Sequence, residues 1–194
     1  DIGAQGIAYF DYDIADYRNT GPDFKPWNLG WSYRNDGVDI ETSTDQSISD
    51  YHISHTKDGE FLKYTFNVLK NDDYTFKLLS SSENTSGVIS IRMNNEILIE
   101  NTELPITGDY NVWTETDLGT VNLSKGQNSI TLLIARGGSN LKMLKIESEA
   151  SLKGEGIYSH SISPNPISKE LSILFESLNP KNIAVVVYNI KGQE

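Results

Sequence analysis

The chain has 194 residues, 37% of them hydrophobic, and 27 acidic against 16 basic side chains give it a formal net charge of -11. So acidic a surface repels phosphate backbones, which excludes nucleic acid as a natural partner. No stretch approaches the ~18 consecutive apolar residues of a membrane-spanning helix. The lack of cysteine excludes disulfides and thiol chemistry.

Alternation of apolar and polar residues with a period of two runs through the middle of the chain and predicts β-strands. Within residues 61–68, the apolar side chains of one face are Leu62, Tyr64, Phe66 and Val68. Similar alternation occurs at 74–79, 88–93, 96–100, 119–123, 129–136 and 141–148. Turn signals such as "MNNE" and "RGGSN" separate these segments. We therefore predict an all-β fold, an antiparallel β-sandwich of the jelly-roll type.

The composition shifts near residue 150, where a polar, glycine-containing stretch with Pro164 and Pro166 begins. The two apolar segments beyond it, 171–177 and 182–190, are too short to bury a core of their own. We therefore expect one sandwich domain at 1–148, a linker at 149–160 and a fragment of a second β domain at 161–194. Both ends read as cuts in a longer chain.

Signals for catalysis are weak. The sequence has no nucleophile elbow, no His-Glu pair at helical spacing and no glycine-rich phosphate loop. His52 and His55 precede a predicted strand without metal-ligand spacing, and we interpret them as polar surface or strand-edge residues. A carboxylate pair for glycoside hydrolysis is defined by its separation in space, so the sequence does not identify one.

Aromatic side chains in polar, loop-like contexts are more informative; they are Tyr12, Tyr17, Trp27, Trp31, Tyr33 and Tyr110. A sugar ring has apolar C–H faces and a polar rim, so an aromatic plate beside amides and carboxylates suits a carbohydrate site. The alternative for each of these aromatics is packing in the core or against a loop.

The order of four segments is similar to family 6 of the carbohydrate-binding modules, over roughly residues 1–147. These segments read "GIAYFDYDIADY", "GWSYRNDGVDIE", "DGEFLKYTFNV" and, from Thr107 to Ile146, "TGDYNVWTETDLGTVNLSKGQNSITLLIARGGSNLKMLKI". The family consists of jelly-roll modules appended to secreted polysaccharide hydrolases. The resemblance implies a non-catalytic polysaccharide-binding module whose catalytic domain, a glycoside hydrolase, lies outside these residues.

The resemblance also implies a binding site in the loops at one end of the sandwich, where two aromatics grip a sugar. The first aromatic matches Tyr33 and the second Tyr110, with Trp113 as the fallback. The sugar-binding asparagine matches Asn140. An acid on the early strand matches Asp11 or Asp13, and Trp31 either walls the site or packs its loop.

The sequence departs from the family pattern at several positions. Two family tryptophans are Phe61 and His55 here, and a family phenylalanine is Ser139. The opening strand, whose carboxylates help to hold a structural calcium ion in the family, has no counterpart, so calcium binding is left open. We expect the chain to start after that strand.

The tail resembles the start of the C-terminal sorting domain used by the type IX secretion system of Bacteroidetes, in "SPNPISKELSI" and "VVVYNIKGQ". This likeness implies recognition by the secretion machinery and a secreted or cell-surface location. For the ligand we favour a β-glucan or an agar-type galactan, then xylan. Two other hypotheses stay open: a catalytic β-sandwich glycoside hydrolase, and a structural or adhesion sandwich without a sugar site.

Overall fold

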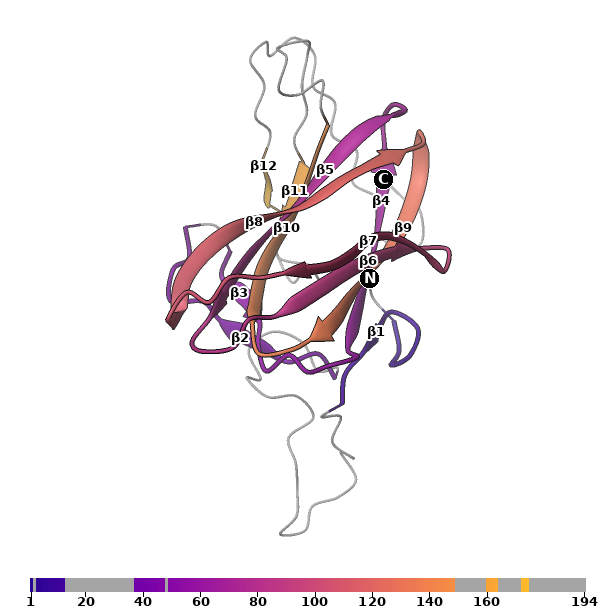
Figure 1. Cartoon of the computed structure of the whole chain (residues 1–194). Helices are drawn as coiled ribbons and strands as arrows, with labels where there is room; N and C mark the ends of the chain where they lie inside the picture. Colours follow the sequence, from indigo (N-terminus) through magenta and orange to yellow (C-terminus); the bar gives the residue numbers. More distant parts are fainter. Residues whose placement is uncertain (2, 13–36, 48, 149–159, 164–171, 175–194) are drawn as a thin grey trace.

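The computed structural model describes residues 1, 3–12, 37–47, 49–148, 160–163 and 172–174, which form two facing antiparallel sheets (Figure 1). The first sheet has the strand order β1 (Tyr9–Phe10), β4 (Phe61–Val68), β9 (Gly126–Arg136), β6 (Val88–Met93) and β7 (Glu96–Glu103). None of the described residues belongs to a helix that is long and apolar enough to cross a membrane. The predicted all-β sandwich is confirmed.

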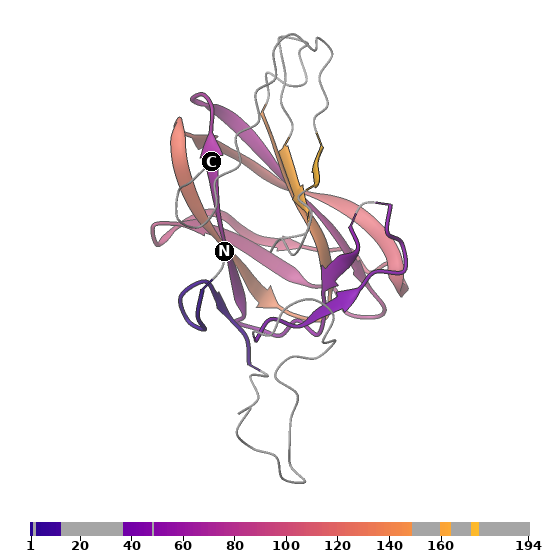
Figure 2. The same cartoon turned by 180° about the vertical axis from the view of Figure 1, so that it is seen from behind.

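The second sheet is built around β10 (Asn140–Ser148), which pairs along one edge with β5 (Asp72–Ser82). Beyond β5 lies β8 (Asp109–Leu123). The other edge of β10 pairs with β3 (Tyr51–Ile53) and, further along, with β11 (His160–Ser163). The outer strands are β2 (Ile40–Thr42) beside β3 and β12 (Ser172–Leu174) beside β11 (Figure 2).

The core lies between the two sheets because alternate side chains of each strand point inward. Its most deeply buried side chains come from both layers: Phe76, Leu78 and Leu123 from the second sheet, and Ile89, Ile91, Ile130 and Leu132 from the first. Removing each of them from water contributes roughly 1.5–3 kcal/mol to stability. This core fixes the strand ends, from which the loops of the candidate site extend.

Two local features explain how the strands connect. The turn between β6 and β7 has positive φ at both Asn94 and Asn95, the backbone of a type I′ hairpin turn. In β8, a register irregularity opposite Phe76 and Lys77 coincides with Gly119, whose φ is +134°. A bulge of this kind lets one strand continue from Asp109 to Leu123.

Candidate functional site at one end of the sandwich

The expected site residues are only partly within the described part of the chain. Tyr33, Trp31 and Asp13 lie outside the described residues. Tyr110, Asn140, Trp113 and Asp11 are described, and the structure separates them into three environments.

Tyr110 and Asn140 both lie near the end of β5. Asn140, the first residue of β10, stands opposite Ser81 in the sheet register. The Ser81 hydroxyl donates a hydrogen bond to the main-chain oxygen of Tyr110 at 2.7 Å. Tyr110 is 40% exposed and Asn140 only 7%. Ser81 thus links the main chain of Tyr110 to the strand position opposite Asn140.

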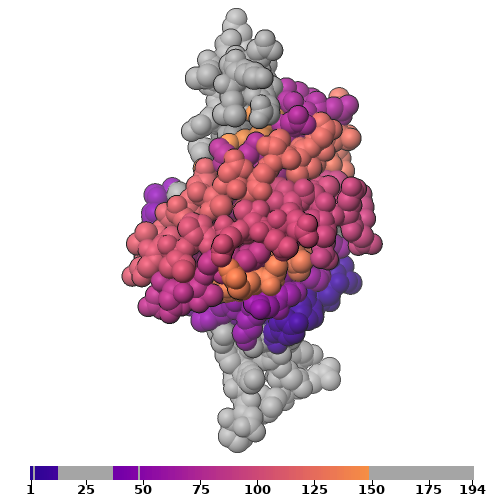
Figure 3. All heavy atoms as spheres, in the orientation of Figure 1, coloured from indigo at the N-terminus to yellow at the C-terminus, as the bar shows by residue number. Residues whose placement is uncertain are grey.

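The loop that leads into Asn140 is held between two other loops. The Thr56 hydroxyl donates to the main-chain oxygen of Ser139 at 2.7 Å, and the Gly138 N–H donates to the Thr56 carbonyl at 3.0 Å. The Gly87 N–H donates to the Ser139 hydroxyl at 3.1 Å. A Cβ at Gly137 would lie 2.1 Å from the Thr56 oxygen, so glycine is required for this close approach. The space-filling view shows this loop reaching the surface at the edge of β6 (Figure 3).

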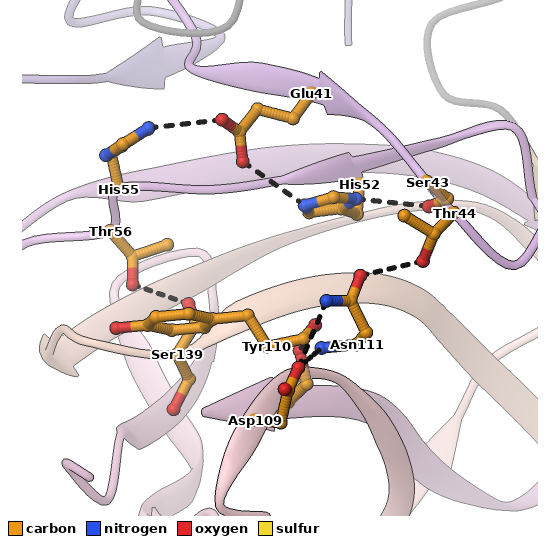
Figure 4. A network of polar contacts seen from close by, with 11 residues as sticks. Glu41, Ser43, Thr44, His52, His55, Thr56, Asp109, Tyr110, Asn111 and Ser139 are labelled. Carbon is orange, nitrogen blue, oxygen red and sulfur yellow. Dashed lines mark hydrogen bonds and ion pairs between the residues drawn. The ribbon is translucent and has the colours of Figure 1, made fainter. Parts of the chain in front are cut away.

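A hairpin completes the site from the other side. The Thr44 hydroxyl, just beyond β2, donates to the Asn111 side-chain oxygen at 2.7 Å. Asn111 in turn donates to Asp109 through its N–H at 2.7 Å and its side-chain amide at 3.0 Å. These contacts, together with those of Ser81 and Thr56, connect the loops at this end of the sandwich one after another. We call these connected residues the loop ring; they are Thr44, Asn111, Tyr110, Ser81, Asn140, Ser139, Thr56 and the β2–β3 hairpin. In Figure 4 the Tyr110 side chain is turned toward Thr56 and Ser139.

Next to the ring, one carboxylate stands between two imidazoles. The Glu41 carboxylate lies 3.5 Å from His52 Nε2 and 3.4 Å from His55 Nε2 (Figure 4). The His52 side chain is 9% exposed and its Nδ1 is 3.1 Å from the Ser43 hydroxyl. Burial lowers the pKa of His52, and although Glu41 opposes that shift, the net direction is downward. His52 is therefore neutral at pH 7.

Trp113 is placed differently from Tyr110. Its ring lies edge-on to His52, with centroids 5.2 Å apart, and the Lys142 ammonium is 4.8 Å from the ring centre. The Lys142 side chain is 0% exposed and its Nζ contacts the Asp45 carbonyl oxygen of the hairpin. Burial lowers the pKa of Lys142. Because the hairpin covers these groups, the fallback assignment of Trp113 as the stacking aromatic is less suited to the geometry than Tyr110.

Asp11 belongs to a third environment, at the end of β1. It is buried near Glu60, whose carboxylate accepts the Lys57 N–H at 2.8 Å and the Tyr12 N–H at 3.2 Å. Burial raises the pKa of Glu60 to about 7, and the negative charges of Asp11 and Asp39 act in the same direction. Among the described residues, no group of three or more His, Asp or Glu side chains could hold a metal ion. Asp11 thus acts electrostatically on Glu60 in this cluster.

Sequence reasoning did not find Thr44, Asn111 or the Glu41 array. The alternation around Glu41 and His52 could have suggested that they share a sheet face, since the register pairs these two residues. No sequence signal joins Thr44 to Asn111, because that contact depends on where the hairpin lies across the sheet.

Comparison with known proteins gives a consistent family. The model of "Carbohydrate binding module (family 6)" matches residues 31–148. The module CBM6cm-2 of Cellvibrio mixtus lichenase 5A, solved in complex with cellotriose, is 25% identical with a TM-score of 0.50 over 57% of this chain and 86% of that one. The C-terminal module of the marine laminarinase LamC from Zobellia galactanivorans is 22% identical with a TM-score of 0.50, over 56% and 86% of the two chains, and supports the fold alone. No curated protein matches the sequence.

Proposed function

The chain belongs to family 6 of the carbohydrate-binding modules, and from this premise we propose that the loop ring binds a neutral polysaccharide, a β-glucan or an agar-type galactan. Modules of this family are binding domains and are generally non-catalytic. The observation that carries the proposal is that Ser81 pairs with Asn140 in the sheet and binds the main chain of the exposed Tyr110, so that both residues lie at the same end of β5. Tyr33 would supply the second aromatic face of the clamp.

The two described residues provide complementary chemistry. The Tyr110 ring offers a face on which the C–H groups of a pyranose stack. Asn140 is 7% exposed, so a ligand that reaches its side-chain amide would be largely shielded from water. An amide supplies two donors and an acceptor, which match a pair of sugar hydroxyls. A bound sugar would satisfy these groups in place of water.

The charges around the ring favour an uncharged glycan. Lys142 is buried against the hairpin and lies 3.9 Å from the Asp45 carboxylate. His52 and His55 both face Glu41. In this described neighbourhood each of these cationic or titratable groups already lies beside a carboxylate, and the whole chain has a net charge of -11. The negative charge of the chain would repel a sulfated or uronic polymer, and no described cationic group around the ring would be left over to bind its anionic groups. The relative solved with cellotriose is consistent with a neutral β-glucan.

The same proposal extends to the parent protein. A module at 1–148, a linker at 149–160 and a sorting segment at 161–194 would tether a secreted glycoside hydrolase to its polymer and raise the local concentration of the enzyme on it. β11 pairs with β10 and β12 pairs with β11, so residues 160–163 and 172–174 extend the module's second sheet. Modules of this family typically occur in extracellular enzymes. For the tail we propose export by the type IX machinery, on the likeness of its sequence motifs.

The test is titration calorimetry of the purified chain with cellotriose, laminarin, barley mixed-linkage β-glucan and agarose oligosaccharides. Loss of one stacking face should cost roughly 1–2 kcal/mol, so Tyr110→Ala should weaken binding about five- to thirty-fold. Asn140→Ala should weaken it as well, because sugar hydroxyls lose their partner. Tyr110→Phe should be milder since the ring face remains.

The control is Ile97→Ala, since Ile97 is an exposed apolar side chain on β7 of the other sheet. Unchanged binding by Tyr110→Ala and Asn140→Ala would refute the site. Absence of binding to every glycan would favour a structural or adhesion sandwich instead. Release of reducing sugar, lost on mutation of a carboxylate, would show that the chain is a hydrolase.

A further inference from the structure

Lys142 lies two residues after Asn140 in β10, and its side chain is 0% exposed. Its ammonium contacts the main-chain oxygen of Asp45 in the β2–β3 hairpin. The same ammonium is 4.8 Å from the centre of the Trp113 ring in β8. One buried cation therefore reaches two segments that are far apart in the sequence, and both of them belong to the surroundings of the proposed sugar site.

The burial of this ammonium needs a reason. A lysine is almost never fully buried without a partner, because removing its charge from water is unfavourable. An apolar side chain of similar volume often gives the same or greater stability in such a place. The ammonium adds direction, since it donates to one particular oxygen and is attracted to the ring beside it. The contribution of Lys142 is therefore to the placement of the two segments it contacts.

The start of β8 depends on such contacts because its ladder with β5 is interrupted there. Between the register pairs of Ser80 and Ser82, β8 has the residues 110–113 where β5 has only one residue. A bulge of this kind takes its residues out of the regular ladder. The position of Tyr110 is therefore set largely by the contacts that the bulge 110–113 makes elsewhere.

Two sets of contacts join this bulge to the β2–β3 hairpin. At the surface, the Thr44 hydroxyl donates to the Asn111 side chain at 2.7 Å (Figure 4). In the interior, the Lys142 ammonium reaches both Trp113 of the bulge and the main chain of Asp45. Because Thr44 and Asp45 are consecutive, the lysine also supports the residue that contacts Asn111.

We propose that Lys142 is a positioning residue for sugar binding: its buried ammonium fixes the bulge of β8 to the β2–β3 hairpin and thereby holds Tyr110 in place near Asn140. The proposal rests on the function proposed above for Tyr110 and Asn140. Lys142 acts through Tyr110, because its own side chain is enclosed. Without the ammonium, the sugar would have to order the Tyr110 ring as it binds, and this ordering lowers affinity.

The experiment is a double-mutant cycle on the binding of barley mixed-linkage β-glucan. Titration calorimetry compares the full wild-type chain, Lys142→Met, Tyr110→Ala and the double variant. Methionine keeps an unbranched apolar side chain and removes the ammonium. Lys142→Met alone should weaken binding roughly three- to tenfold, within the range of coupling between residues of one contact network.

The double variant separates positioning from a general loss of structure. If Lys142 acts through Tyr110, its substitution has no further effect once the Tyr110 ring is gone. The double variant should then bind as Tyr110→Ala does. A double variant in which the two losses multiply would overturn the proposal.

The matched control is Lys145→Met. Lys145 lies on the same strand and contacts Glu115 of β8, which stands in the regular ladder opposite Leu79. This variant should bind glucan as wild type does, and equal losses in the two methionine variants would overturn the proposal. Lys142→Gln keeps a donor for the Asp45 oxygen without the charge, and it replaces Lys142→Met in the cycle if the methionine variant does not fold.

A second measurement does not depend on the sugar. In two-dimensional NMR of the free chain, Lys142→Met should shift or broaden the Tyr110 and Asn111 amide signals, and Lys145→Met should leave them in place. Unchanged signals in Lys142→Met would overturn the positioning role even if that variant binds more weakly. If wild type binds no glycan while these signals respond as expected, the proposed function fails and the positioning of the bulge by Lys142 remains.

Discussion

The sharpest stability prediction concerns Glu60, which lies buried beside Asp11 and Asp39. Its pKa rises from 4.5 to about 7 in the folded chain, so the folded state retains this proton over a range in which the unfolded chain has lost it. The stabilisation is therefore fully present below pH 4.5 and is lost as the pH rises through 7. Between pH 5.5 and 8.5, this single group should lower the free energy of unfolding by about 2 kcal/mol.

Urea unfolding followed by tryptophan fluorescence at pH 5.5, 7.0 and 8.5 measures this loss. The variant Glu60→Gln has no titrating carboxyl. Over the same pH range, the fall in its free energy of unfolding should therefore be about 2 kcal/mol smaller than the fall in wild type. Glutamine keeps one acceptor oxygen for the two N–H groups that Glu60 now accepts, so some stability should be lost at every pH. If the difference between wild type and Glu60→Gln is the same at all three pH values, the raised pKa is refuted.

Two further predictions concern the loops around the site. Gly137→Ala places a Cβ 2.1 Å from the Thr56 main-chain oxygen, so the backbone must move. We expect this variant to lose about 1–3 kcal/mol of stability and to bind glucan more weakly. An unchanged thermal melt and binding titration would contradict the close packing. Trp113→Ala removes the ring that packs against His52 and Lys142, and should lower stability by roughly 2–3 kcal/mol in a thermal melt. If instead its melt is normal while binding is lost, Trp113 is a ligand residue.

The strands with strict local alternation could be predicted from the sequence. The segments 61–68 and 88–93 coincide with β4 and β6, although strict alternation of burial holds only in the second half of β4. β8 begins at Asp109, ten residues before the predicted segment at 119–123. Its first half is mostly exposed and follows the edge of β5, so it has no buried alternation to reveal it.

The site was only partly predictable for a different physical reason. Tyr110 and Asn140 were predicted as sugar-binding residues through family likeness, and Ser81 links the main chain of Tyr110 to the strand position opposite Asn140. The covering of Trp113 depends on the hairpin after β2, which crosses the sheet to reach Lys142. Contacts between segments about a hundred residues apart, such as Asp45 and Lys142, leave no periodic pattern in the chain.

The positions where the sequence departs from the family pattern each gain a contact of their own. Ser139, in place of a phenylalanine, accepts the Gly87 N–H through its hydroxyl and so holds the Asn140 loop. Phe61, in place of a tryptophan, stacks on Phe10 across β1 and β4 with ring centroids 6.2 Å apart. His55, in place of another tryptophan, faces Glu41. Near the loop ring, the departures therefore replace aromatic packing with polar contacts, whereas far from it, at Phe61, aromatic packing is kept.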